Sequence, residues 1–315
     1  MRRALVRHTG GMAGRFAPSP TSGLHLGNLR TAMAAWLMAR ATGRAFRLRI
    51  EDLDTQRVAA APGVAKAQMA DLFALGLDFD GPVVWQSERL DAYAEVADAL
   101  SGRLYECFCT RREIAQAASA PHGDGFRPYP GTCRDLTPSQ RARLRRERPP
   151  AWRIRADDVP FTARDVWAGE VTGTVDDFVV RRNDGVWAYN LAVVVDDLAQ
   201  GVDQVARGDD LLESAPRQAW LTSLLGGNPP IYAHVGLVSD SGDERLSKRR
   251  HSPTLAECRA HGHDTDAVRS ALAASLGLAE PGEPVTMSQL LARFSPGEFD
   301  HGPWGFTPGA WPLAS

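Results

Sequence analysis

One proline-rich stretch constrains the fold of this chain more than any other. It runs from Arg15 to Asn28 and reads Arg-Phe-Ala-Pro-Ser-Pro-Thr-Ser-Gly-Leu-His-Leu-Gly-Asn. Proline holds φ near one value, and the residues from Leu29 to about Thr42 have the one-sided apolar spacing of a helix, which Gly43 then ends. The stretch therefore predicts a stiff passage from a short strand, beginning at about Arg15, into that helix.

The start of this helix is a candidate site for a phosphate group. The first N–H groups of a helix have no partner within it and carry a partial positive charge. Gly27 and Asn28 lie at this point, and the ring of His25 can donate a hydrogen bond beside them. We therefore predict that His25, Gly27 and Asn28 bind a phosphate group.

The residues after this helix predict the class of fold. Phe46 to Ile50 alternates apolar residues with arginine, the period of a strand with one buried face, and Glu51 begins an acidic run at its carboxyl end. Helices are expected at Pro62–Leu75 and Glu88–Leu100, and helix-like stretches follow nearer the C-terminus at Asp264–Leu276 and Thr286–Phe294. The order of strand and helix predicts a doubly wound, Rossmann-like α/β domain with a parallel sheet, in which ligands bind at the carboxyl ends of the strands.

Three of the four cysteines, Cys107, Cys109 and Cys133, lie close together in the sequence. Four cysteines cannot form a disulfide framework for a chain of 315 residues, so a metal is the first expectation. Three thiolates with a phenolate or an imidazole can fill a tetrahedral zinc site, and Tyr129 and His122 are the candidates for that fourth ligand. The spacing alone leaves open whether the cysteines bind zinc or are buried structural thiols.

Lysine usage singles out one further residue. Of the 36 basic residues only Lys66 and Lys248 are lysines, and Lys248 lies in the pentapeptide Arg-Leu-Ser-Lys-Arg, from Arg245 to Arg249. The guanidinium of arginine is a planar fork, whereas the lysine ammonium is a compact, mobile charge that can follow a phosphate during a reaction. The placement of Lys248 therefore favours a role in phosphate chemistry.

Several of these motifs resemble those of class I aminoacyl-tRNA synthetases. The stretch from Phe16 is similar to the first signature of that class in its glutamyl-tRNA synthetase version, with Asn28 in place of the second histidine. The segment Arg207–Gln218 resembles the Arg-Gly-x-Asp-Leu-Leu-x-Ser-Thr-x-Arg-Gln of the glutamyl family. Tyr232–Val238 resembles its Tyr-x-His-x-Pro-Leu, with glycine for proline, and Arg245–Arg249 resembles the second signature, Lys-Met-Ser-Lys-Ser.

The resemblance implies that the chain activates L-glutamate with ATP. A carboxylate is best held by a forked guanidinium, and the substrate ammonium needs an anion and an oxygen. Chemistry and resemblance together predict a glutamate site of Arg15, Ser19, Glu51, Tyr189 and Arg207.

Catalysis of this activation requires no general base, because the attacking carboxylate is already ionised. It depends on alignment and on stabilising the charge that accumulates on the phosphates. We expect His25, the helix start at Gly27 and Asn28, Lys248, and a Mg²⁺ ion bound with ATP to do this.

The cysteine segment carries the resemblance further. Cys-x-Cys-Thr-Arg followed by Tyr-x-x-x-Cys-Arg resembles the zinc module inserted into glutamyl-Q tRNA(Asp) synthetases, which implies Zn²⁺ bound by Cys107, Cys109, Tyr129 and Cys133. Those enzymes attach glutamate to the queuosine base in the anticodon loop of tRNA(Asp). The sequence after Arg249 leaves no room for the large anticodon-binding region of full-length glutamyl-tRNA synthetases, which favours tRNA(Asp) as the partner.

Three other functions stay open. The first is a truncated glutamyl-tRNA synthetase that charges the 3′ end of tRNA(Glu); the others are a small-molecule nucleotidyltransferase and a silent RNA-binding module. With a net charge of −2, RNA must be bound by a local patch, and the arginine-rich helix expected at Ser139–Arg148 is either such a patch or an ordinary solvated helix.

The sequence also suggests how the chain is organised. We expect an extension (1–14), the first half of the catalytic domain (15–106), an inserted zinc-binding subdomain (107–150), the second half (151–238), and a signature loop with a truncated, helical, stem-contacting C-terminal region (239–315). Translation starts at Met1 or Met12. No apolar run is long enough to span a membrane and no secretory signal is present, so we expect a cytoplasmic protein, acting as a monomer.

Overall fold

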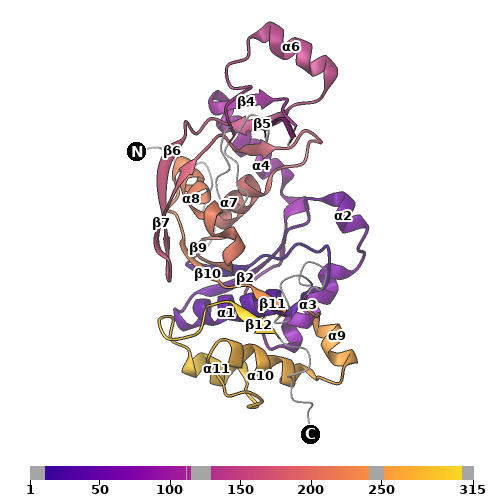
Figure 1. The fold of residues 1–315 in the computed structure, drawn as a ribbon, viewed down its shortest axis with the longest axis vertical. Helices are drawn as coiled ribbons and strands as arrows, with labels where there is room; N and C mark the ends of the chain where they lie inside the picture. Colours follow the sequence, from indigo (N-terminus) through magenta and orange to yellow (C-terminus); the bar gives the residue numbers. More distant parts are fainter. Residues whose placement is uncertain (1–10, 111, 115–128, 241–251, 307–315) are drawn as a thin grey trace.

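The protein is built on a seven-stranded sheet with the strand order β3-β2-β1-β9-β10-β6-β7 (Figure 1). The structure is a computed structural model and describes residues 11–110, 112–114, 129–240 and 252–306. All neighbouring strands are parallel except β6 and β7. In spatial order the strands are β3 (Val84–Trp85), β2 (Ala45–Ile50), β1 (Ala13–Phe16), β9 (Val202–Gly208), β10 (Ile231–Val235), β6 (Val159–Asp165) and β7 (Gly169–Val175).

Helices cover both faces of this sheet, which confirms the doubly wound fold. On one face α1 (Leu26–Ala41) packs against β1 and β2, and α10 (Thr265–Ser275) and α11 (Met287–Arg293) pack beneath it in Figure 1. On the other face lie α7 (Tyr189–Ala199) and α8 (Ala215–Leu224). The expected helices Asp264–Leu276 and Thr286–Phe294 correspond to α10 and α11 within one residue at each end.

The remaining helices surround this core. The expected helices Pro62–Leu75 and Glu88–Leu100 are α3 (Val64–Ala74) and α4 (Leu90–Ala99). The short α2 and α9 were not predicted. Their bounds, with those of the 3₁₀ helices, are α2 (Thr55–Ala59), α9 (Leu255–Ala260), η1 (Gln86–Glu88), η2 (Ser101–Arg103) and η4 (Asp209–Ser214).

Helix α1 begins three residues earlier than the sequence indicates. The expected start was Leu29, but the helix starts at Leu26, with His25 as its N-cap. The Asn28 N–H donates to Nδ1 of His25 at 3.3 Å, and the His25 N–H donates to Oδ1 of Asn28 at 3.3 Å. This reciprocal pair has the form of a capping box, made here by residue types that the usual pattern does not contain.

The expectation that β2 buries only its apolar face is wrong, because one of the two arginines on its other face is buried too. Arg49 is fully buried, as are the apolar residues Phe46, Leu48 and Ile50. The reason is that the second face of β2 is covered as well: Arg49 contacts Asp197 of α7, a helix on the face opposite α1. Burying a guanidinium is costly, and carboxylates in the site described below offset that cost.

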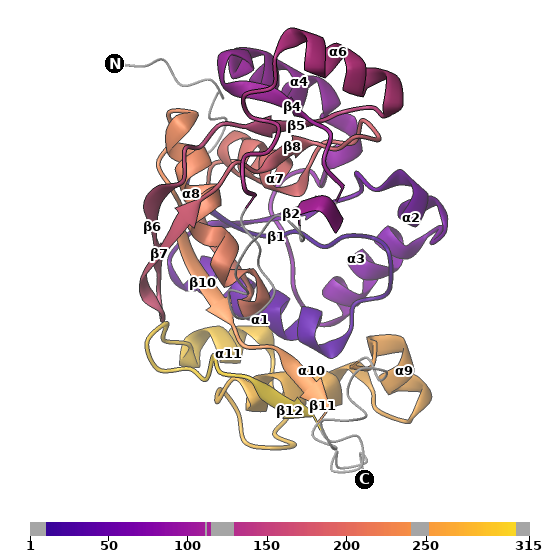
Figure 2. The same ribbon diagram turned by 45° about the horizontal axis from the view of Figure 1, so that its top comes forward.

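A second, antiparallel sheet lies beyond α7 (Figure 2) and consists of β4 (Leu104–Cys107), β5 (Ala151–Ile154) and β8 (Val179–Arg181). The arginine-rich helix predicted nearby is α6 (Pro138–Glu147). Residues on both sides of the expected 107–150 insertion belong to one sheet, because Glu106 and Trp152 are register partners. The division into subdomains stays a proposal.

The last described strands join distant parts of the chain. β11 (Val238–Asp240) pairs in parallel with β12 (Trp304–Phe306). In the ranges that the structure describes, no helix has both the length and the apolar character needed to cross a bilayer.

Candidate active site

A cavity of about 650 Å³ opens at the carboxyl ends of β1, β2 and β9. The chain continues from β1 to β2 on one side, whereas β9 lies on the other, so this is the switch point at which doubly wound sheets bind ligands. The cavity brings together eight residues that the sequence places in the site: Arg15, Ser19, His25, Gly27, Asn28, Glu51, Tyr189 and Arg207. Their roles stay predictions.

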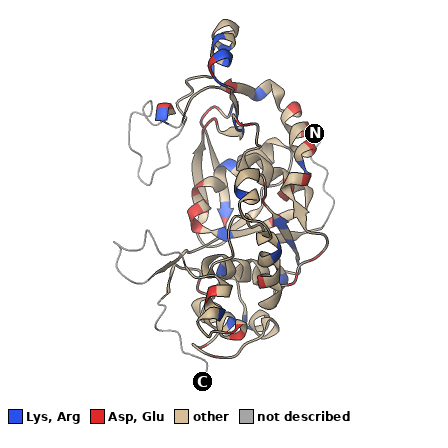
Figure 3. Cartoon of the chain, turned by 90° about the vertical axis from the view of Figure 1, so that its right-hand side faces the viewer, with Lys and Arg blue, Asp and Glu red and all other residues tan. Residues whose placement is uncertain are grey.

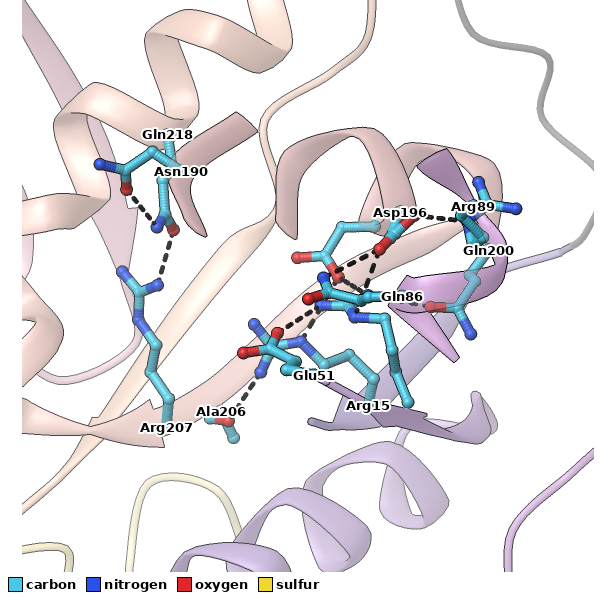
Figure 4. A network of polar contacts seen from close by, with 12 residues as sticks. Arg15, Glu51, Gln86, Arg89, Asn190, Asp196, Gln200, Ala206, Arg207 and Gln218 are labelled. Atoms are coloured by element: carbon cyan, nitrogen blue, oxygen red, sulfur yellow. Dashed lines mark hydrogen bonds and ion pairs between the residues drawn. The ribbon is translucent and has the colours of Figure 1, made fainter. Parts of the chain in front are cut away.

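Arg15 offers one end of its guanidinium to this cavity. Its side chain is buried, with Nε 3.4 Å from Oδ1 of Asp197 and Nη1 3.4 Å from the carbonyl oxygen of Ala206 (Figure 4). Within the described part of the chain, Nη2 has no hydrogen-bond partner among these contacts. The Nη2 end can therefore donate to a carboxylate of a ligand.

Arg207 is held much more completely. Its Nη1 donates to Gln218 at 2.6 Å, and its Nη2 lies 3.0 Å from the carbonyl oxygen of Leu211 and 3.1 Å from Oγ of Ser214. The remaining nitrogen, Nε, donates to His234 at 3.0 Å. These contacts leave one N–H of Nη1 for a ligand, so Arg207 can offer its charge and a single hydrogen bond rather than a two-pronged grip.

Glu51 supplies the carboxylate of the site. One of its oxygens lies 3.3 Å from Nη2 of Arg49. Burial raises the pKa of Glu51, and the nearby guanidiniums of Arg49 and Arg15 offset this only in part. An ammonium group bound beside Glu51 would stabilise its ionised form.

Arg49 is a residue of this site that the sequence did not reveal. Its Nη1 lies 2.6 Å from Oδ1 of Asp197 and 2.9 Å from Oε1 of Gln200. Burial opposes the charge of Arg49, but Asp197 and Glu51 together raise its pKa. Burial likewise acts against ionisation of Asp197, yet Arg49 and Arg15 lower the pKa of that carboxyl. The result is a network of ion pairs in which Arg49 and Asp197 connect Arg15 and Glu51, two residues that line the cavity.

The turn before α1 fixes the histidine ring. Because Nδ1 of His25 accepts the Asn28 N–H, the proton of a neutral ring lies on Nε2. The Asn28 N–H is thus already used inside the turn, in contrast to the free donor expected from the sequence. A Cβ at Gly27 would lie 3.1 Å from the His25 ring, so glycine lets the ring occupy this place.

Lys248 and the whole pentapeptide Arg245–Arg249 lie outside the described residues, so their distance from His25 stays a prediction. The chain on both sides of this segment is described. Before it, Val238 lines the cavity, and after it Thr254 forms a β-bridge with His25. Both flanks therefore lie at the turn that begins α1.

Gly236 stands where the related motif has proline, and the structure explains the glycine. Its N–H donates to the carbonyl oxygen of His301 at 2.7 Å. A Cβ at this position would approach the nitrogen of Pro303 to 2.3 Å. A proline here would lose the hydrogen bond and collide with the neighbouring backbone.

The three cysteines predicted to bind a metal converge. The sulfurs of Cys107, Cys109 and Cys133 lie within 4.8 Å of one another, with 3.5 Å between those of Cys109 and Cys133. The hydroxyl of Tyr129 is 3.4 Å from Sγ of Cys107 and 3.7 Å from Sγ of Cys109. Zinc with ligands at about 2.3 Å in a tetrahedron would separate them by about 3.8 Å, so this donor set fits a metal ion. His122, the competing ligand, lies outside the described residues.

The electrostatics of the cluster favour at least one thiolate. Hydrogen bonds from Cys109 and Cys133 lower the pKa of Cys107, although burial acts in the opposite direction. Burial and the neighbouring Cys107 raise the pKa of Tyr129, so its phenol stays protonated unless a cation displaces the proton.

The fold and this site define the class of the protein. Residues 12–285 match the family model "tRNA synthetases class I (E and Q), catalytic domain", and the chain belongs to that class. The sequence prediction of a ligase of the aminoacyl-tRNA synthetase type is thus confirmed. A solved glutamate tRNA ligase from Elizabethkingia meningosepticum, in complex with its amino acid, matches with a TM-score of 0.76 and 27% identity over 96% of this chain and 67% of that chain.

Curated relatives narrow the class further. A protein of Nocardia farcinica is 54% identical over 94% of this chain and 94% of its own length. One of Cutibacterium acnes is 58% identical over 89% of this chain and 79% of its own length. Both have the name glutamyl-Q tRNA(Asp) synthetase, and the chain belongs to this family, as its motifs predict.

Proposed function

We propose that the protein activates L-glutamate with ATP and transfers it to the queuosine base of tRNA(Asp). The observation that carries the proposal is the cavity at the switch point, which joins two guanidiniums and a largely buried carboxylate to the start of a helix. The names of the relatives that are 54% and 58% identical support the same reaction.

Glutamate matches the charges of this cavity. It brings two carboxylates and one ammonium, and the cavity offers Arg15, Arg207 and Glu51. We assign one carboxylate to the Nη2 end of Arg15 and the other to the remaining N–H of Arg207. The ammonium lies between Glu51 and the hydroxyl of Tyr189, and Ser19 completes the cradle.

Activation forms a bond between an α-carboxylate oxygen and the α-phosphorus of ATP and breaks the bond to the pyrophosphate leaving group. The turn at His25 and Gly27 binds the phosphates, and Lys248 follows the charge that accumulates on the leaving group. Mg²⁺ bound with ATP supplies further positive charge. Because the nucleophile is an anion, these residues act by alignment and neutralisation rather than by removing a proton.

A second cavity, of about 770 Å³, provides a route for the acceptor. It shares Ser19, Glu51 and Tyr189 with the first cavity and reaches to Cys109 and Trp187. An acceptor group in this second cavity can therefore approach the activated glutamate past Ser19, Glu51 and Tyr189, since neither His25 nor Gly27 lines it. We propose that the described residues of one chain suffice for both cavities and that the protein acts as a monomer.

The arginine-rich helix α6 is the proposed contact for RNA phosphates. Figure 3 shows it as a protruding, largely basic element at one end of the molecule. Arg145 pairs with Glu106 at 2.7 Å, whereas Arg143 and Arg146 are exposed. Exposed arginines on a chain with a net charge of −2 give the local positive patch that RNA binding requires.

Glutamate-dependent exchange between pyrophosphate and ATP tests the activation step. We expect exchange with L-glutamate, and only weak exchange with L-glutamine or L-aspartate, because a neutral amide or a shorter side chain mismatches the guanidiniums. Absence of exchange with glutamate, both with and without tRNA, would contradict the proposed enzyme and favour an RNA-binding module.

We propose further that Cys107, Cys109, Cys133 and Tyr129 hold a structural Zn²⁺ ion. In Cys133→Ser we expect purified protein to lose its one equivalent of zinc, measured by mass spectrometry of the metal. Loss of a ligand should cost at least about 2 kcal/mol, which lowers the Tm of a chain of this length by about 3 °C or more. Cys258→Ala is the control, since that buried thiol belongs to another core cluster and should leave the zinc content unchanged. Equal zinc in both variants would contradict the site.

A further inference from the structure

A buried pair that does not line the cavity lies beside Arg207, on β10 and β6, the strands that follow β9 across the sheet. His234 on β10 accepts the Nε–H of Arg207 through its Nε2 at 3.0 Å. Its other ring nitrogen, Nδ1, lies 2.7 Å from Oδ2 of Asp165, at the end of β6. His234 is 5% and Asp165 6% exposed, so water does not reach this chain of contacts.

The contacts of Asp165 fix where the histidine proton lies. Oδ1 accepts the N–H groups of Trp167 and Ala168, each at 2.9 Å, and Oδ2 also accepts the backbone N–H of His234 at 3.1 Å. An ionised carboxylate can only accept, so the hydrogen bond to Oδ2 must carry its proton on Nδ1. The lone pair of Nε2 then faces Arg207.

The pKa values of the pair agree with this arrangement. Burial opposes ionisation of Asp165, but hydrogen bonds from His234 and the Ala168 and Trp167 N–H groups lower its pKa. Burial lowers the pKa of His234, Arg207 lowers it further, and the opposing effects of Asp165 and Asp209 do not outweigh them. At neutral pH the pair is therefore a carboxylate with a neutral imidazole.

We propose that Asp165 and His234 are positioning residues that hold the Arg207 guanidinium in the orientation that binds glutamate. This inference rests on the proposed function of Arg207. Gln218 and Ser214 hold the Nη atoms, and His234 is the partner of Nε among the described contacts. Without His234 the buried Nε–H of Arg207 would lack an acceptor, and the guanidinium would turn toward a different acceptor.

The arrangement also makes glutamate binding depend on pH. Protonation of His234 places an N–H on Nε2 that faces the Nε–H of Arg207. This contact then holds two hydrogen-bond donors and two positive charges, so it is repulsive. The groups that face the ring are Asp165 from β6, Arg207 from β9, Asp209 from η4 and the stacked ring of Tyr232, 5.9 Å away. We expect the Kd for glutamate to rise as the pH falls through the His234 pKa, below the ordinary value of about 6.5.

Two substitutions at one position separate the contacts. His234→Gln places an amide oxygen near the position of Nε2 and keeps the acceptor for Arg207. His234→Asn places an amide near the position of Nδ1 and keeps only the contact with Asp165. Asp165→Asn is a second variant, because the backbone N–H groups hold its oxygen and turn its NH₂ toward the histidine, which favours the wrong tautomer.

Calorimetric binding of glutamate to the full chain, between about pH 5 and pH 8, tests the inference. We expect His234→Asn and Asp165→Asn to raise Kd about tenfold at neutral pH, as for one hydrogen bond to a charged group. His234→Gln should bind within about threefold of the wild type and lack the acidic rise in Kd assigned to His234. Glu51 titrates in all variants alike, so the difference between profiles isolates His234. ATP binding should be unchanged throughout.

Two results would overturn the positioning role. One is equal glutamate affinity in the Asn and Gln variants, with both folded by thermal melting. The other is the same pH profile in His234→Gln as in the wild type. A wild-type protein that binds no glutamate at any pH would instead overturn the proposed function together with this inference.

Discussion

Replacing Lys248 by alanine should lower the rate of glutamate-dependent pyrophosphate exchange by about 10²–10³-fold, as for loss of one preorganised donor at a developing charge. Glutamate binding should survive, because five other residues, all of which line the cavity, are assigned to glutamate. The loss should therefore appear in kcat and not in the Kd for glutamate.

Lys66→Ala is the matched control for this experiment. Lys66 is the other lysine of the chain and is exposed on α3, so its removal changes the net charge by the same amount. We expect it to leave exchange unchanged. If exchange by Lys248→Ala equals that of Lys66→Ala, Lys248 has no part in the reaction.

Arg15→Ala should weaken glutamate binding by about 10²–10³-fold, because removing one partner of a buried charge pair typically costs 2–5 kcal/mol. The fold should tolerate this change, since Asp197 keeps its 2.6 Å contact with Arg49. The glutamate affinity of Arg15→Lys should lie between those of the wild type and Arg15→Ala, since lysine keeps the charge but loses the forked guanidinium. Titration calorimetry with glutamate measures both variants.

Arg47→Ala serves as the control for Arg15→Ala. Arg47 is the register partner of Arg15 on the neighbouring strand, and its Nη1 donates to the carbonyl oxygen of Asp80 rather than into the cavity. Equal glutamate affinity in Arg15→Ala and Arg47→Ala would remove Arg15 from the site.

The sequence predicted those parts of the fold that depend on local order. The helices α10 and α11 were expected as helix-like stretches that alternate with Pro and Gly, and the Rossmann-like class follows from alternating strands and helices. The start of α1 was missed because a histidine caps it. The burial of Arg49 was missed because period alone cannot show that carboxylates from α7 cover the second face of β2.

In the candidate site, too, the sequence revealed the residues of local motifs but not those that only the fold brings together. Residues in contiguous motifs, such as His25 and Gly27, were found because their spacing is local. The cysteine cluster was found for the same reason, and the structure brings its sulfurs together. The pair Asp165 and His234 is separated by 69 residues in the sequence, and only the adjacency of β6 and β10 brings the two side chains into contact.

The acceptor distinguishes the proposed reaction from its nearest alternative, a glutamyl-tRNA synthetase that charges the 3′ end of tRNA(Glu). Both would share the glutamate and ATP sites, so variants in those sites cannot separate them. The most direct measurement supplies labelled glutamate and ATP together with queuosine-containing tRNA(Asp), the same tRNA without queuosine, or tRNA(Glu). The labelled position is then located by nuclease digestion and mass spectrometry. We expect label on the queuosine base of tRNA(Asp) alone; label on the terminal ribose of tRNA(Glu), with none on queuosine, would contradict the assignment.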